Sequence, residues 1–217
     1  MARKLTEEKR NEMIEAGIRE FARCGYEGAN TNEIARMAGV SAGVLFKYYG
    51  DKETFFLACL QRSVDTLEET LRQVENADGD ALSKAESLVR VLIRFSREHG
   101  HCIRMYQMIT AERSSELAAR LSAEIEGVSA RVYNAYFAKA QAEGEMRRDI
   151  DAKYAAFFFD NLLMMLQFTY SCSYYKQRLL TYTGIDADDE SADYEMIRQL
   201  LRFIDGAMST HNEKGIS

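Results

Sequence analysis

Two lysines stand where a cation could help to bind an anion. Lys52 follows Asp51, an expected helix N-cap, and therefore occupies the first position of the next helix. The helix dipole disfavours a cation there, but a phosphate bound between the ammonium and the free backbone N–H groups would explain it. The alternative is an exposed lysine that is tolerated at a cost of about 0.3–1 kcal/mol. Lys47, the only long cation in the preceding predicted helix, could reach a phosphate or a base edge.

Other chemistries have weaker support. The run His99-Gly100-His101-Cys102 holds metal-binding residue types, but no further cluster of ligands accompanies it, so polar residues at a helix break are the favoured interpretation. The four cysteines have no C-x-x-C spacing, which favours free thiols in a reducing cytoplasm. No Ser/His/Asp or nucleotide-binding loop pattern is present. We therefore expect no metal, no cofactor and no enzymatic activity.

The elements that must position these lysines are helices. Apolar residues recur at helical spacing over residues 5–24, Thr6 can serve as N-cap, and Gly25 can end the helix in the left-handed conformation. The chain contains no proline and only 13 glycines, which permits long helices almost everywhere and disfavours a β-sandwich with many turns.

Two shorter helices follow. Asn30 or Thr31 caps the second, and Glu33, three residues after Asn30, fits a capping box. Ser41 caps a third helix over residues 42–49, after a turn that contains glycine. This is the helix-turn-helix pattern. Helices of seven or eight residues are not stable alone, so the first helix and the start of the fourth must complete a small core. A purely structural helical subdomain is the alternative.

From Arg10 to Glu53 the sequence resembles the DNA-binding domain of the tetracycline-repressor (TetR) family of bacterial transcriptional regulators. The resemblance runs in one unbroken register over about a fifth of the chain. One departure is Phe46, where the family usually carries Tyr, so a phosphate-contacting hydroxyl is missing there. The matching residues are Ile14, Ala16, Phe21, Gly25-Tyr26, Thr31, Ile34-Ala35, Ala38-Gly39-Val40-Ser41, Gly43, Leu45-Phe46, Tyr48-Tyr49 and Lys52-Glu53.

The resemblance implies that the third helix is a recognition helix for the major groove of DNA. Ala42 or Val44 could meet a thymine methyl, and Gly43 could let the backbone approach, although small apolar residues also suit plain helix packing. The resemblance makes Thr31 and Lys52 phosphate contacts. The full set of candidate DNA-binding residues is Thr31, Ser41, Ala42, Gly43, Val44, Phe46, Lys47, Tyr48 and Lys52.

Charge is divided unevenly along the chain. Residues 1–62 contain ten Lys/Arg and nine Asp/Glu, whereas the whole chain has a formal net charge of −6, so the remainder carries −7. A balance of +1 is not itself a nucleic-acid signature. The acidic remainder would repel DNA, which suits a body held away from the duplex.

Beyond residue 51 the periodicity predicts helices at 52–75, 81–98, 101–110, 114–143, 151–180 and 192–209. We therefore expect an all-α fold of about nine helices, with a three-helix helix-turn-helix domain over residues 1–51. A larger domain for ligand binding and dimerisation is expected over 52–217, and the helix from Lys52 is shared by both.

One apolar run, Tyr154–Tyr175, is long enough to mimic a membrane span. Asp160, Asn161 and Gln167 lie near its middle, and a carboxylate at mid-bilayer costs several kcal/mol. We therefore expect a helix buried on nearly all sides within the protein, and no membrane partner. The start of the chain has no apolar signal region, which favours a cytoplasmic location.

The last predicted helix has two apolar stripes. One holds Met196, Leu200, Phe203 and Ala207, and the other holds Ile197, Leu201, Ile204 and Met208. If one stripe packs on its own chain, the second needs a partner, which a two-fold four-helix bundle supplies. We assign Leu201, Ile204 and Met208 to the dimer interface. A monomer that buries both stripes internally is the alternative.

The middle of the chain is rich in methionine and aromatic residues, which suit an adaptable apolar pocket but are also ordinary core residues. Tyr106, Tyr133, Phe137 and Met165 are the candidate ligand contacts. The resulting hypothesis is a dimeric, ligand-responsive transcriptional regulator, a repressor released from a palindromic operator by a small apolar effector. The alternative is an all-helical small-molecule-binding protein or enzyme with a purely structural N-terminal domain.

Overall fold

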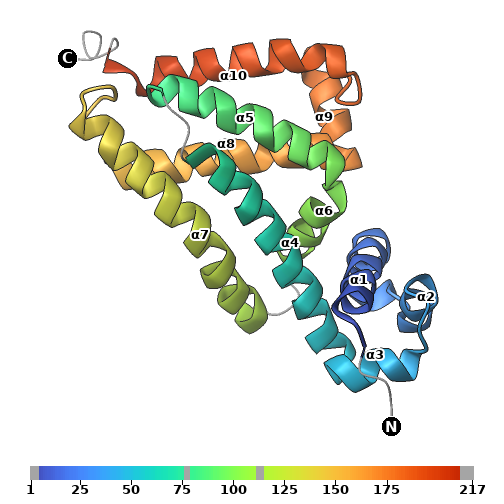
Figure 1. Ribbon diagram of the computed structural model, residues 1–217. Coiled ribbons are helices and arrows are strands. Elements are labelled where there is room, and N and C mark those ends of the chain that lie inside the picture. Colours follow the sequence, from blue (N-terminus) through green and yellow to red (C-terminus); the bar gives the residue numbers. More distant parts are fainter. Residues whose placement is uncertain (1–4, 76–78, 111–114, 211–217) are drawn as a thin grey trace. The chain divides into compact units, whose positions relative to one another are not determined.

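The computed structural model describes residues 5–75, 79–110 and 115–210, and within them it confirms the all-α fold class (Figure 1). The described part contains ten α-helices and no named strand. The helices are α1 (Glu7–Gly28), α2 (Thr31–Met37), α3 (Ala42–Tyr49), α4 (Lys52–Glu75), α5 (Ala81–Glu98), α6 (Gly100–Thr110), α7 (Ser115–Ala142), α8 (Ala152–Ser171), α9 (Ser173–Thr183) and α10 (Asp193–Met208).

The described residues form two compact units. The first unit consists of residues 5–67 and 101–110, so it holds α1 to α3, the first two-thirds of α4, and nearly all of α6. The second unit consists of residues 68–75, 79–100 and 115–210. The division into domains at residue 51 stays a prediction, because α4 begins inside the first unit and ends inside the second.

Local signals fix the ends of α1 and α4 as predicted. The Thr6 side chain accepts a hydrogen bond from the Lys9 backbone N–H at 3.2 Å, and this caps α1. Gly25 has φ +74°, a conformation that suits a residue without Cβ, and it interrupts the helical backbone where the sequence predicts a stop. Asp51 caps α4 by accepting a hydrogen bond from the Thr54 N–H at 2.7 Å.

The expected capping box of α2 is half right. Asn30 is the N-cap, and its side chain accepts from the Asn32 N–H at 2.9 Å. Glu33 does not return to the Asn30 N–H, because its carboxylate pairs with Arg36 on the next turn. The Asn30 N–H instead donates to Glu20 of α1 at 3.3 Å. A contact across the unit therefore replaces the local one.

An aromatic cluster forms the core of the first unit. Phe21 of α1 is fully buried, and its ring centroid lies 5.0 Å from that of Phe56 and 6.0 Å from that of Phe55 on α4. Tyr49 at the end of α3 packs on Phe55 at 4.8 Å. Leu45, also fully buried, anchors the middle of α3. The two short helices are thus held by packing on α1 and α4, as their lengths require.

In the second unit α8 packs on both α5 and α7, and α10 packs on α5 (Figure 1). Its core includes Phe95, Phe159 and Leu163, each about fully buried. An ion pair ties α5 to α10, since Arg97 contacts Asp193 at 2.7 Å while its guanidinium lies 4.9 Å from the Tyr170 ring centroid.

A single helix over residues 151–180 is the one clear error in the predicted elements. The chain leaves the helical conformation at Cys172, where φ is −118° and ψ is 127°, and this separates α8 from α9. Thr169 donates to the Met165 carbonyl and Ser171 to the Gln167 carbonyl, both at 2.8 Å. Such back-bonding weakens and bends helices. The break at Cys172 also explains why the described residues form ten α-helices and not the predicted nine or so.

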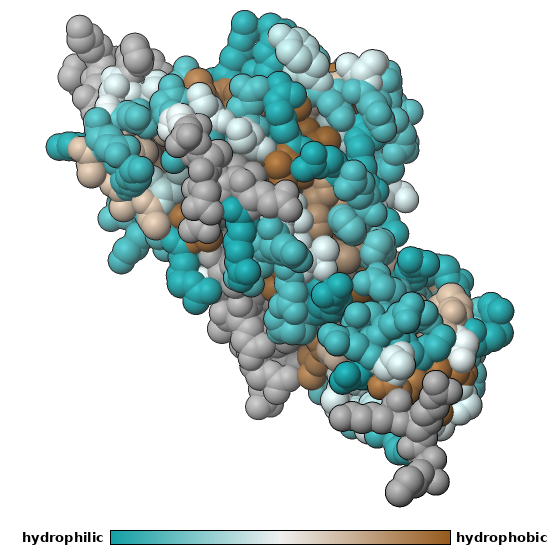
Figure 2. All heavy atoms as spheres, in the orientation of Figure 1, coloured by the Kyte–Doolittle hydropathy of each residue, from teal (hydrophilic) through white to brown (hydrophobic). Residues whose placement is uncertain are grey.

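The expectation that α8 is buried on nearly all sides is also wrong. Four large apolar side chains of α8 are exposed, namely Tyr154 (65%), Phe157 (62%), Phe158 (52%) and Met165 (39%). The face of the molecule drawn in Figure 2 is covered mostly by hydrophilic residues. Helical spacing places Tyr154, Phe158 and Met165 on one side of α8. In the described part of the chain, no helix has the length and hydrophobicity to cross a membrane.

The closest approach between α1 and α4 gives a stability prediction. A Cβ atom at Gly17 would lie 2.6 Å from both Cys59 Sγ and Phe55 Cζ, so Gly17→Ala forces the two helices apart. We expect a loss of about 1–3 kcal/mol in the free energy of unfolding, as for other overpacked cores, measured by urea denaturation. Gly28→Ala in the same helix is the control, because Gly28 is exposed and its nearest neighbour is 3.5 Å away. Equal effects of the two variants would contradict the steric explanation.

Candidate functional site

The turn between α2 and α3 has the geometry of a helix-turn-helix. Gly39 adopts φ +65°, and the Val40 N–H donates to the Ala35 carbonyl at 2.9 Å, which closes the turn. Buried Ile34 and Leu45 hold the two helices on the core of the unit. This leaves the other side of α3 for recognition.

The candidate residues on α3 fall into two groups. Gly43, Phe46 and Lys47 are exposed and share one side of the helix by their spacing, whereas Ala42 and Val44 are half-buried. Lys47 makes no hydrogen bond or ion pair with the residues that the structure describes. Its ammonium is therefore available to a phosphate or a base edge. Ser41 is also exposed and makes no side-chain capping bond, so its hydroxyl can donate to an anion.

Tyr48 has a contact that the sequence did not indicate. Its hydroxyl oxygen accepts a hydrogen bond from the Leu5 backbone N–H at 2.8 Å. The hydroxyl proton can still be donated, because a phenol is both donor and acceptor. Tyr48 therefore ties the segment that precedes α1 to the recognition helix, and its predicted phosphate contact stays a prediction.

Lys52 has an internal role. Its Nζ donates to the Glu27 carbonyl at 3.2 Å and lies 5.2 Å from the centroid of the Tyr26 ring. The cation thus sits close to the end of α1, where the helix dipole favours it, as well as at the start of α4, where the dipole does not. Two of its three donors remain for a phosphate. The predicted phosphate contact is compatible with this geometry but is not required to explain the lysine.

Thr31 is half-buried at the first position of α2. The position of this helix start depends on Glu20, a residue that the sequence analysis did not identify. Glu20 is only 3% exposed, accepts from Arg23 at 2.7 Å and accepts from the Asn30 N–H, so it fixes the start of α2 on α1. Burial raises the pKa of Glu20, but the hydrogen bonds from Arg23 and Asn30 lower it to below its ordinary value. The sequence did contain a sign of this buried carboxylate, because Glu20 lies within the apolar stripe of α1, next to Phe21.

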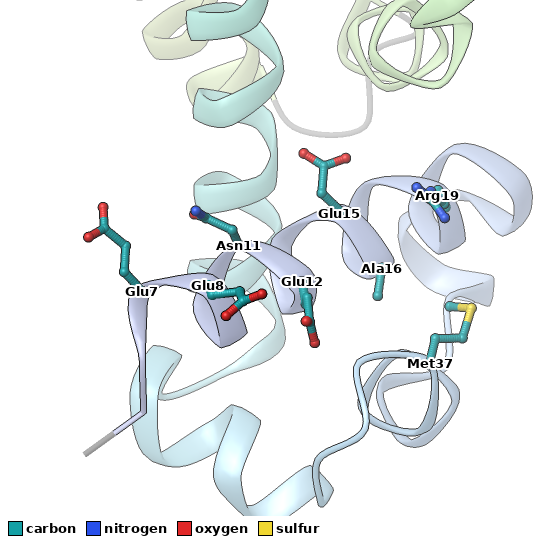
Figure 3. A pocket seen from close by; sticks show the side chains of 8 residues that line it. All are labelled: Glu7, Glu8, Asn11, Glu12, Glu15, Ala16, Arg19 and Met37. Atoms are coloured by element: carbon teal, nitrogen blue, oxygen red, sulfur yellow. The ribbon is translucent and has the colours of Figure 1, made fainter.

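An acidic hollow runs along α1 and reaches Met37 of α2 (Figure 3). Four glutamates line it, and they would repel phosphates, so the hollow is not suited to bind a nucleic acid. The lining residues are Glu7, Glu8, Asn11, Glu12, Glu15, Ala16, Arg19 and Met37.

The second unit holds an apolar cavity of about 220 Å³. Of the predicted ligand contacts, Tyr133 lines it, whereas Phe137 lines a smaller neighbouring cavity of about 50 Å³. Met165 lines neither of these two cavities and is 39% exposed, and Tyr106 lies on α6 in the first unit. The lining residues of the larger cavity are Leu71, Lys84, Ala85, Leu88, Val132, Tyr133, Ala135, Tyr136, Lys139 and Phe159.

The assignment of α10 residues to a dimer interface stays a prediction, and burial within the chain bears on which stripe is free. Ile204 is 5% exposed, and both Ile204 and Met208 line the smaller cavity, so this stripe packs on its own chain. Leu201 is half-buried. Phe203, 62% exposed, belongs to the other stripe and faces outward. Sequence periodicity identified the two stripes but could not tell which of them faces α5.

His99 and His101 lie at the junction of α5 and α6. Among the residues that the structure describes, no group of three or more His, Cys, Asp or Glu side chains has the arrangement of a metal site. Cys102 is buried, and burial raises the pKa of its thiol. This suits a packing role rather than a reactive one.

Comparisons with known proteins agree with the helix-turn-helix. Residues 13–59 match the family model of bacterial regulatory proteins of the tetR family. The HTH-type transcriptional regulator HbdR of Aromatoleum sp. (strain CIB) is 38% identical over 73 residues, 33% of this chain and 32% of that relative. The transcriptional activator FasR of Mycolicibacterium smegmatis is 34% identical over 89 residues, 41% of each chain. The chain thus covers less than half the length of either relative.

Similarity of fold extends further. The structure of FadR from Bacillus subtilis, solved in complex with stearoyl-CoA, has a TM-score of 0.69 at 15% sequence identity, covering 88% of this chain and 97% of that one. Residues 13–59 are thus similar to the helix-turn-helix of the tetR family of bacterial regulatory proteins, and the all-helical fold is shared with the FadR structure.

Glu20 gives a prediction for the geometry of α2. Glu20→Gln removes the charge that binds Arg23, and we expect a loss of about 1 kcal/mol in the free energy of unfolding near pH 7. Because the folded-state pKa is lowered, this stabilisation is complete above the ordinary pKa of glutamate and disappears as the pH falls through the folded value. The difference between wild type and variant should therefore shrink in acid, measured by urea denaturation from about pH 7 to about pH 3.5.

Glu33→Gln is the matched control, because it removes an exposed ion pair from the same part of the unit. We expect a much smaller effect from it. A Glu20→Gln difference that grows in acid would contradict the proposed role of the carboxylate.

Proposed function

We propose that the protein is a dimeric, ligand-responsive transcriptional regulator, a cytoplasmic repressor that leaves a palindromic operator when a small apolar effector binds. The observation that carries the proposal is the helix-turn-helix with Lys47, Phe46 and Gly43 on the exposed side of α3. That side offers a cation that has no partner among the residues the structure describes, and a glycine that permits close approach to DNA. The buried side of α3 keeps it in one orientation.

Reading a palindrome requires two copies whose recognition helices lie about 34–36 Å apart. The exposed apolar residues of the second unit supply a surface for this. We assign the dimer interface to the outward stripes, Phe203 with its neighbours on α10 and Tyr154, Phe158 and Met165 on α8. These side chains are large and apolar, and covering them in an isologous interface removes their contact with water.

The proposal that an effector releases the protein from DNA is supported by the position of the cavity, which α4 helps to line. Leu71 of α4 lines the cavity, and α4 is one continuous helix that begins at Lys52, directly after the recognition helix. A ligand that prefers one orientation of α4 would change the spacing of the recognition helices. FadR of Bacillus subtilis, which shares the fold, was solved with stearoyl-CoA bound. Differential binding of about 1–3 kcal/mol is the usual size of such coupling.

The test is a selection of binding sites from random duplex DNA, followed by a reporter gene placed behind the selected site. We expect an inverted repeat and higher reporter expression when the gene for the protein is deleted. Lower expression in the deletion strain would identify an activator, as FasR is named. Binding no tighter than to random DNA would favour a helical small-molecule-binding protein instead.

Two lysines give the prediction for DNA. Lys47→Ala should weaken operator binding, reduce the slope of log affinity against log salt by about one unit, and relax sequence preference if the ammonium reaches a base. Lys52→Ala should weaken binding to all sequences alike. Fluorescence anisotropy at several salt concentrations measures both. Lys153→Ala, at an exposed lysine of α8, is the control, and an equal slope for Lys47→Ala and this control would refute the assignment.

The proposed dimer surface gives the next prediction. Phe203→Glu should yield folded monomers in light scattering, because it places a charge in the proposed interface. Ile204→Glu should instead destabilise the fold, since a charge would then be buried within the chain. Tyr182→Glu, 76% exposed on α9, is the matched aromatic control and should remain dimeric. Dimers that persist in both Phe203→Glu and Phe158→Glu would overturn the assignment.

A further inference from the structure

The cavity of the second unit carries a specific charge pattern. We propose that the effector is a small apolar carboxylate, bound with its carboxylate at Lys84 and its apolar body among α4, α5, α7 and α8. This inference rests on the proposed function for its regulatory meaning, but it makes a separate statement about which compounds bind.

The walls of the cavity suit an apolar body of limited size. Phe159 lines it, and the ring centroids of Tyr133 and Tyr136 lie 5.5 and 6.2 Å from that of Phe159. Leu88 and Val132 add aliphatic surface. An apolar cavity of 150 Å³ can hold benzene. About 220 Å³ therefore accommodates an aromatic ring or a short branched chain with a few further atoms.

Lys84 is a cation without a counter-ion on this wall. Its side chain is half-buried and makes no ion pair or hydrogen bond with the described residues, whereas Lys139, the other lysine of the cavity, lies 3.7 Å from Glu143. The lysine stands in the second turn of α5, near the end of the helix that favours an anion. A bound carboxylate would satisfy both the ammonium and this preference.

The nearby acids do not take that place. The Asp80 carboxylate accepts a hydrogen bond from the Ser83 N–H, and the Glu145 carboxylate accepts one from the Ala81 N–H, both at 2.8 Å. Each acid is thus used to satisfy a backbone donor at the start of α5. Lys84 therefore remains as the charged group with which an anionic ligand can form an ion pair.

Tyr133 points to a polar group on the ligand. Its side chain is 4% exposed and lines the cavity, and its hydroxyl makes no hydrogen bond with the described residues. Donation to a ligand oxygen would satisfy this hydroxyl. Asp160 influences Tyr133 electrostatically and is not among the lining residues, and burial followed by repulsion from Glu126 raises its pKa to about 6. Because Asp160 is not part of the lining, it provides no carboxylate on the cavity wall for a cationic ligand.

Three compounds of one shape and different charge test the proposal. Phenylacetate, 2-phenylacetamide and 2-phenylethylamine carry −1, 0 and +1, and their affinities for the full-length protein can be compared by isothermal titration calorimetry. We expect phenylacetate to bind at least tenfold more tightly than the amide, and the amine to bind least. Lys84→Met, which keeps the length of the side chain, should abolish the difference between acid and amide.

Lys153→Met is the matched control, because Lys153 is an exposed lysine of the same unit outside the cavity, and it should leave all affinities unchanged. Tyr133→Phe should weaken phenylacetate binding without loss of the preference for an anion. Equal affinities for acid and amide, an unchanged preference in Lys84→Met, or no binding of any of the three compounds would overturn the proposal.

Operator titrations then separate this inference from the proposed function. Phenylacetate that binds through Lys84 but leaves operator affinity unchanged would support the carboxylate site and refute induction through it. A neutral compound that releases operator DNA while phenylacetate does not bind would support induction and refute the carboxylate site.

Discussion

The aromatic contact between α1 and α4 is the constraint on which the first unit depends. α2 and α3 have seven and eight residues, too few for stable isolated helices, so their orientation must come from packing. Phe21 brings α1 onto Phe55 and Phe56, and Tyr49 and Leu45 then attach α3 to the same core. The side of α3 that remains exposed is decided by what is buried. The exposed side of α3, which we propose as the recognition surface, is thus a consequence of apolar packing, and mutations in the core can be expected to move it.

Polar groups add a second level of order that is common to both units. Near the start of α2 the carboxylate of Glu20 is used by Arg23 and a backbone N–H, and near the start of α5 two acids are used by backbone N–H groups. Each unit also has a lysine, Lys47 in the first and Lys84 in the second, that makes no hydrogen bond or ion pair with the described residues. These acids therefore accept hydrogen bonds within the protein, while the two lysines remain available to bind an external anion. This division explains how an acidic chain, with a net charge of −6, can present sites for anionic partners.

The sequence predicted what local rules decide. The caps at Thr6 and Asp51 and the left-handed Gly25 follow from residue type and position, and the structure confirms each. The break at Cys172 was missed because it depends on back-bonding by Thr169 and Ser171 within an otherwise apolar helix. The sequence could not decide which stripe of α10 faces a partner because both stripes are apolar, and only contact with neighbouring helices distinguishes them. Glu20 was missed for the same reason, since its partner Asn30 lies ten residues away across a turn.

The size of the cavity also limits how the proposed regulation can work. A compact ligand of about ten heavy atoms binds with at most about 1.5 kcal/mol per atom in the best cases and usually with much less. Coupling of about 1–3 kcal/mol between effector and operator is a modest part of that energy, so a small carboxylate can be sufficient if its contacts differ between the two orientations of α4. Leu71 is the cavity residue on that helix and is therefore where the difference must arise, because a ligand that contacts only α5, α7 and α8 would bind both orientations equally and shift neither. By linkage, operator DNA must then weaken effector binding by the same factor.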